Sequence, residues 1–109
     1  MVEPIIVLVT ASNLEEAARL ARALVEQRLA ACVNMISDLR SIYWWQGRVE
    51  DADEVLLIAK TARHLLPATT RLVESLHSSA VPEILALPIV GGSAPYLEWL
   101  ATEVRAEAP

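Results

Sequence analysis

The side chains best suited to bind a metal ion in this 109-residue chain are one cysteine and two histidines. An imidazole is a borderline ligand that suits Cu(II) and Zn(II), whereas a thiolate is a soft ligand that suits Cu(I). His77 follows an amphipathic segment, and the simpler role of a residue there is to cap the end of a helix. Cys32 lies between Ala31 and Val33, a setting that favours a small buried side chain. His77 is therefore the principal metal candidate and Cys32 a weaker one, each in need of ligands from elsewhere.

Three consecutive aromatic residues, Tyr43, Trp44 and Trp45, occur in a chain with only two tyrosines, three tryptophans and no phenylalanine. On a strand, Tyr43 and Trp45 share one face and Trp44 takes the other. Because an isolated hairpin cannot bury both faces, we expect these aromatics to anchor an interface between subunits. Glu54 and Lys60 could add acid–base groups to Tyr43, although nothing in the sequence indicates a substrate.

The sequence lacks the common catalytic motifs. It contains no Walker A or dinucleotide-binding glycine pattern, no G-x-S-x-G nucleophile elbow, and neither C-x-x-C nor H-E-x-x-H. We therefore expect a protein that is not an enzyme and that has no organic cofactor. The net charge of −5, from 9 basic and 14 acidic residues, also argues against nucleic acid as a partner.

The composition of the chain indicates whether it enters a membrane and in which compartment it works. It is 54% hydrophobic, yet its longest apolar runs fall far short of the ~20 residues that a membrane span requires. We therefore expect no membrane partner, and we expect the apolar excess to be buried between subunits. The single cysteine and the absence of secretory-signal features at the N-terminus predict a cytoplasmic protein. Residues 1–109 are expected to form one domain.

Hydrophobic periodicity predicts the element order β-α-β-β-α-β followed by one more helix. This order predicts an α+β ferredoxin-like sandwich, with helices on one face of an antiparallel sheet. The second and third strands form a long β-hairpin whose outer half is too polar for a core, so it should project beyond the sheet. The predicted strands cover residues 4–10, 32–36 with 41–45, 48–59 and 84–90, and the predicted helices cover residues 13–29, 65–76 and 95–105.

Local signals fix the ends of several elements. Ser12 and Glu15 form an S-x-x-E capping box before the first helix. The polar residues 37–38 interrupt the second strand, and Gln46–Gly47 supplies the hairpin turn. Pro88 must lie at an edge or a bulge, because proline donates no hydrogen bond to a neighbouring strand.

Seven short segments then occur in order along the chain: VLVTA (7–11), ACVN (31–34), S-x-Y-x-W-x-G (41–47), E-x-x-x-E (50–54), KT (60–61), VPEI-x-x-LPI (81–89) and YLEW (96–99). Together they resemble the CutA divalent-cation-tolerance family. The resemblance implies a ferredoxin-like subunit in a homotrimer, built by pairing of long hairpins and similar in architecture to PII signalling proteins. It also implies a role in tolerance of copper and other divalent ions, with no established catalytic reaction.

One segment departs from the family pattern. Where the family usually reads His-Pro-Tyr-Glu before the VPEI segment, this chain reads His77-Ser78-Ser79-Ala80. The cysteine that some bacterial members place near the end of the first strand is Val9 here. We therefore expect weak binding of Cu(II) or Zn(II), with His77 as a ligand only while its imidazole is neutral.

The alternative is a PII-like regulatory protein. In that case a cleft between subunits would bind a small anionic metabolite through Lys60 and the nearby aromatic residues Tyr43 and Trp45. Both hypotheses share the homotrimer and differ in the charge of the ligand.

Overall fold

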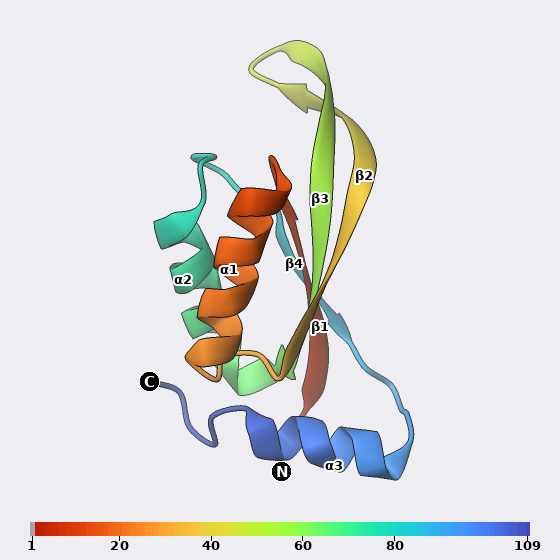
Figure 1. The fold of residues 1–109 in the computed structure, drawn as a ribbon, viewed down its shortest axis with the longest axis vertical. Coiled ribbons are helices and arrows are strands. Elements are labelled where there is room, and N and C mark those ends of the chain that lie inside the picture. The colour runs from red at the N-terminus through yellow and green to blue at the C-terminus, as the bar shows by residue number, and fades with distance from the viewer. Residues whose placement is uncertain (1) are drawn as a thin grey trace.

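The computed structural model describes residues 2–109 and consists of a four-stranded antiparallel sheet, two helices on one of its faces and a third helix across one end (Figure 1). The strand order β2-β3-β1-β4 is that of a ferredoxin-like sandwich. The predicted α+β class, element order and C-terminal helix are confirmed. The elements are β1 (Pro4–Ala11), α1 (Leu14–Glu26), β2 (Cys32–Trp45), β3 (Arg48–Ala62), a 3-10 turn η1 (Arg63–Leu65), α2 (Leu66–Leu76), β4 (Ile84–Pro88) and α3 (Ala94–Glu103).

The core lies between the sheet and the helices α1 and α2. Alternate residues of the two central strands, such as Val7 in β1 and Leu57 in β3, point into it and are fully buried. Leu20 and Leu24 of α1 and Val73 of α2 cover them from the other side. The opposite face of the sheet carries no helix, and we call it the open face.

The first turn of α1 differs from the predicted capping box. The N-cap is Asn13, whose side chain accepts a hydrogen bond from the N–H of Glu16 at 2.8 Å. Glu16, not Glu15, then reaches back to the N–H of Ser12. The prediction was wrong by one residue because both S-x-x-E and N-x-x-E fit this segment, and packing selects the second.

The end of α1 also differs, because the helix stops three residues earlier than predicted. Arg28 adopts a left-handed conformation with φ 56°. The N–H of Arg28 bonds to the carbonyl of Val25, and that of Leu29 bonds to the carbonyl of Leu24, which together form a Schellman motif. Leu29 and Leu24 are both buried. The sequence does not predict this helix end, because arginine occupies the left-handed position that glycine usually holds.

The second strand is continuous where a break was predicted. Ser37 and Asp38 form a bulge opposite Val55, and Asp38 has a φ of 64°. A bulge adds one residue to a strand without ending its pairing. It also shifts the alternation of side chains, so Tyr43 and Trp45 lie on the open face of the sheet by register.

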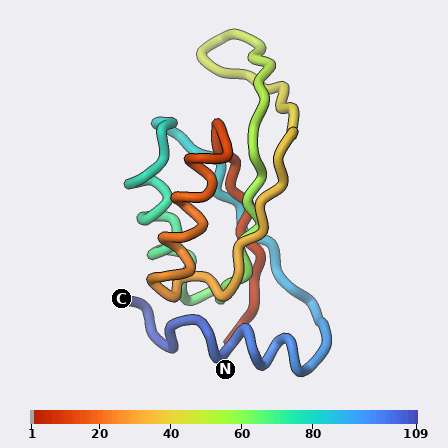
Figure 2. The backbone as a smooth tube through the Cα atoms, in the orientation of Figure 1, coloured from red at the N-terminus to blue at the C-terminus, as the bar shows by residue number. Residues whose placement is uncertain are grey.

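The hairpin of β2 and β3 extends well beyond the helical layer, as predicted (Figure 2). Its turn is the predicted pair Gln46–Gly47, and both residues have positive φ, as a two-residue type I′ turn requires. Arg40 and Asp51 brace its outer half with two hydrogen bonds of 2.8 and 2.5 Å. The projecting hairpin makes the chain elongated, with extents of 44 × 27 × 23 Å.

Two of the six prolines lie in helix and strand positions that the chemistry of proline allows. Pro67 lies in the first turn of α2, where its missing N–H leaves no helical bond unmade. Pro88 is the last residue of β4, which is an edge strand. β2 forms the other edge of the sheet, so each edge has backbone groups available for pairing with another strand.

Candidate functional site

A wide groove of about 800 Å³ lies between the outer part of the hairpin and the segment that follows α2. We call it the hairpin groove. It combines the aromatic residues predicted at an interface with the principal metal candidate. Its lining residues are Thr10, Ser41, Ile42, Tyr43, Trp44, Trp45, Glu54, His77, Ser79, Val81, Pro82 and Glu83.

His77 enters this groove from the C-terminal cap of α2, and both of its ring nitrogens are engaged. Nε2 lies 2.7 Å from the carbonyl oxygen of Thr10, and Nδ1 accepts a hydrogen bond from the N–H of Ser79 at 2.9 Å. A carbonyl can only accept and an N–H can only donate, so the ring is neutral with its proton on Nε2. The lone pair of Nδ1 is therefore occupied, and the imidazole can bind a metal only after the amide of Ser79 moves away.

Glu16 anchors the segment next to His77, and sequence reasoning missed it. Its Oε1 accepts hydrogen bonds from the N–H and hydroxyl of Ser12 at 2.9 and 3.0 Å, and its Oε2 accepts one from the N–H of Ser78 at 2.7 Å. Burial by itself raises the pKa of Glu16, but the hydrogen bonds from Ser12 and Ser78 outweigh it and lower that pKa from 4.5 to about 2. A signal was present: Glu16 lies four residues before Leu20, on the buried stripe of the helix.

The aromatic and acidic lining gives the groove its chemical character. Trp44 is 74% exposed, whereas Tyr43 and Trp45 are 43% and 39% exposed. The groove also holds the carboxylates of Glu54 and Glu83, and no lysine or arginine of residues 2–109 lines it. Its charge therefore favours a cation over the small anionic metabolite of the alternative hypothesis.

The structure does not bring Lys60 to this groove. Lys60 and Glu54 are six residues apart on β3, which places them about 20 Å from each other along the strand. The acid–base group of Tyr43, Glu54 and Lys60 is therefore not assembled within one chain. Lys60 instead donates a hydrogen bond to the side chain of Asn34 on the open face.

Cys32 lies beside Lys60 at the inner end of the hairpin and is half-buried, so it is less enclosed than a core residue. Thr10, which contacts His77, pairs with Leu56, four residues before Lys60 on β3. A separation of four residues corresponds to about 13 Å along a strand. The two predicted metal candidates, Cys32 and His77, are thus separate in one chain. Within residues 2–109, no three His, Cys, Asp or Glu side chains are grouped to hold a metal ion.

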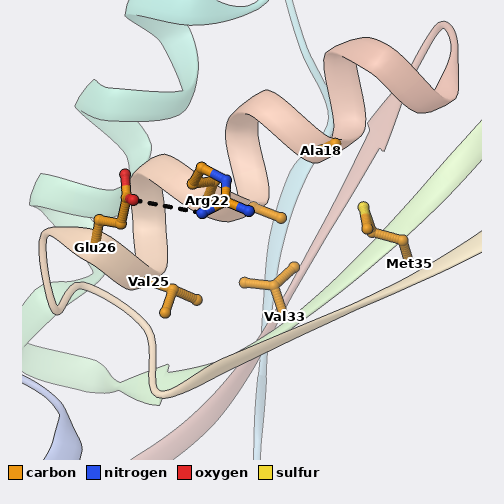
Figure 3. A pocket seen from close by; sticks show the side chains of 7 residues that line it. Ala18, Arg22, Val25, Glu26, Val33 and Met35 are labelled. Carbon is orange, nitrogen blue, oxygen red and sulfur yellow. Dashed lines mark ion pairs between the residues drawn. The ribbon is translucent and has the colours of Figure 1, made fainter.

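A smaller groove of about 290 Å³ lies between α1 and the start of β2. Figure 3 shows Val33 and Met35 of β2 facing the α1 side chains, with the ion pair of Arg22 and Glu26 at 3.6 Å along the helix. This pair is strongly exposed and contributes little to stability. Because the groove has neither an imidazole nor a thiol in its lining, we assign the candidate site to the hairpin groove.

Comparison with known proteins identifies the family. A sequence model described as CutA1 divalent ion tolerance protein matches residues 5–103. The chain belongs to the CutA1 family. The resemblance drawn from the seven segments is therefore confirmed, and this CutA1 chain can be compared with its relatives.

Two relatives cover most of this CutA1 chain. The divalent-cation tolerance protein CutA of Thermus thermophilus is 50% identical over 95 residues, which cover 87% of the chain and 92% of the relative. The rice protein CutA 1, described as chloroplastic, is 47% identical over 104 residues, which cover 95% of the chain and 59% of the relative. The chain thus spans less than two thirds of the rice protein.

Solved CutA1 structures share this fold. The Thermus thermophilus protein superimposes with a TM-score of 0.91 at 47% identity, covering 94% of this chain and 99% of that one. CutA1 from Oryza sativa gives a TM-score of 0.94 at 46% identity, covering 97% of each chain. Within residues 2–109, none of the helices is both long and apolar enough to cross a membrane.

Proposed function

We propose that this CutA1 chain acts in tolerance of divalent cations by holding Cu(II) or Zn(II) weakly and reversibly in the hairpin groove. The observation that carries the proposal is the lining of the groove, which combines the imidazole of His77 with the carboxylates of Glu54 and Glu83. Imidazole and carboxylate groups are suitable ligands for both ions. The ion is the cargo of the protein, and no catalytic step is needed for this role.

The weakness of binding has a physical cause. A metal ion at Nδ1 of His77 must replace the hydrogen bond from the N–H of Ser79, so part of the coordination energy is lost. The other ligands of the ion would be water, a carboxylate of the groove or a side chain of a neighbouring copy. Sites that hold metals tightly use three or four protein ligands.

Calorimetric titration with Cu(II) and with Zn(II) tests this proposal. We expect saturable binding near neutral pH that is lost in His77→Ala and weakened in acid, because protons compete with metal ions for imidazole ligands. His64→Ala is the matched control, because His64 bonds to the carbonyl of Arg105 and does not line the groove. Identical isotherms for the wild type and His77→Ala would assign His77 a purely structural role.

We further propose that the working form is a homotrimer, as the family resemblance implies. The open face supports this, because Ile36, Leu85 and Leu87 project from it and are 49%, 55% and 47% exposed. The free edges of β2 and β4 can add strands from neighbouring copies. Exposed aromatics such as Trp45 would then anchor adjacent subunits.

Sedimentation equilibrium at micromolar concentrations tests the trimer. We expect a mass three times that of the chain and a melting temperature that rises with protein concentration. A folded species with the mass of one chain would contradict the proposal.

We propose a non-enzymatic protein that works in the cytoplasm, where a reducing environment keeps the free thiol of Cys32 intact. Fractionation of cells that express a tagged chain tests the location, and recovery outside the cytoplasm would contradict it.

A further inference from the structure

Glu16 is a charged side chain at a buried position. Only 3% of the residue is exposed, although acidic residues are rarely buried to this extent without partners. Ser12 supplies two donors to one carboxylate oxygen, and Ser78 supplies one donor to the other. Each oxygen is therefore satisfied, and the carboxylate links the start of α1 to the segment after α2.

Helix capping does not explain the bond to Ser78. The side chain of Asn13 already caps α1 by accepting from the N–H of Glu16. Glu15 lies in the same first turn and its side chain is exposed. Its negative charge there interacts favourably with the positive end of the helix dipole. The distinctive contact of Glu16 is thus a tertiary one, made 62 residues away in the sequence.

Ser78 lies between His77 and Ser79, the two residues joined by the hydrogen bond to Nδ1 of the imidazole. The residue before it is His77, whose Nε2 contacts Thr10, and the residue after it is Ser79, whose N–H occupies Nδ1. A bond of 2.7 Å to the N–H of Ser78 therefore fixes the backbone at the centre of this arrangement. A charge-assisted bond of this kind is stronger than one between neutral groups.

We propose that Glu16 is a positioning residue for the hairpin groove: by holding the backbone of Ser78, it keeps Nδ1 of His77 covered by the amide of Ser79. In this arrangement, the Glu16–Ser78 contact controls how readily the imidazole is released to a ligand. The link to metal affinity rests on the proposed function, whereas the link to the geometry of His77 does not.

The test compares Glu16→Gln with Glu15→Gln, which removes the same charge from the neighbouring exposed position. Glutamine is nearly isosteric but carries one acceptor oxygen, so it cannot serve both Ser12 and Ser78. Near neutral pH and without metal, we expect the amides of Ser78 and Ser79 to exchange about tenfold faster or more in Glu16→Gln. Nitrogen NMR of His77 should show a mixture of tautomers in that variant and the Nε2-protonated form in Glu15→Gln.

A zinc titration then connects the contact to the groove. If the amide of Ser79 limits access to Nδ1, Glu16→Gln should bind Zn(II) more tightly than Glu15→Gln, and His77→Ala should abolish the difference. Altered exchange and tautomers with no zinc binding in any variant would sustain the positioning role and overturn the proposed metal function.

Other outcomes overturn the positioning role itself. Exchange rates and tautomers of Glu16→Gln that match those of Glu15→Gln would do so. If Glu16→Gln does not fold, exchange in the wild type decides: the amide of Ser78 should be protected by about tenfold or more over an unstructured peptide. An unprotected amide would show that the contact does not hold the segment.

Discussion

Trp45 pairs directly with Arg48 across a turn of only two residues, Gln46 and Gly47. Both turn residues have positive φ, at 49° and 78°, which matches the twist of the two strands. The closure of the whole projecting hairpin, and with it the position of Trp45, therefore depends on a backbone conformation that favours glycine.

Replacing Gly47 with alanine should lower the free energy of unfolding by about 1 kcal/mol, the cost of a left-handed conformation for a residue with a Cβ. No atom lies within 4 Å of the added Cβ, so the cost comes from the backbone alone. Urea denaturation measures the effect. Gly91→Ala is the control, because that site is equally open and has no positive φ. Equal effects at both sites would contradict this account.

Glu16→Gln should also change the dependence of stability on pH. The pKa of Glu16 is lowered from 4.5 to about 2 in the folded chain, so the ionised carboxylate stabilises the fold above about pH 4.5. This stabilisation, on the order of 3 kcal/mol, is lost as the pH falls towards 2. Denaturation curves from neutral to acid pH should therefore converge for wild type and variant. A constant difference across that range would count against the assignment.

Thr69→Val should stabilise the protein. Thr69 is fully buried in α2, and its hydroxyl has no hydrogen-bond partner among residues 2–109. Valine has nearly the same shape without the polar group, so the free energy of unfolding should rise by about 1 kcal/mol. Thermal melts of Thr69→Val and of the half-buried neighbour Thr70→Val give the comparison. A destabilised Thr69→Val would indicate that the hydroxyl does have a partner.

Trp45→Ala should weaken the proposed trimer. Loss of a buried aromatic side chain costs about 3–5 kcal/mol, and Trp45 is the proposed anchor between subunits. Denaturation at several protein concentrations, with sedimentation in parallel, measures the change. Trp44→Ala is the matched control, because Trp44 takes the opposite face of the strand and is 74% exposed. An unchanged trimer in Trp45→Ala would remove Trp45 from the interface.

The sequence by itself determined the element order, because local periodicity records which face of each element is buried. The continuous apolar run of β1 and the helical spacing of Ala17, Ala21 and Leu24 predict a strand and a helix without knowledge of their neighbours. The hairpin turn was predictable for the same reason, since the requirement at Gly47 is local. The family was also predictable, because its seven segments are short local motifs that can be recognised in the sequence without the structure.

Only the tertiary structure decided the state of the candidate site. The partners of His77 and Ser78 are Thr10 and Glu16, which are more than 60 residues away in the sequence, and no local pattern links them. Packing of α1 against α2 selects these contacts. It determines that Glu16 is buried and Glu15 exposed, although both residues fit a capping motif.

The separation of Lys60 from Glu54, by contrast, follows from the geometry of a single strand. Both residues lie on one long strand, and a strand extends about 3.3 Å for each residue, so the hairpin holds them far apart. The bulge at Asp38 then decides which side chains of β2 share a face with them, because it changes the alternation midway along the strand. Sequence alone determined which residues could do chemistry, whereas the long-range pairing of β2, β3 and the segment after α2 decided which of them meet.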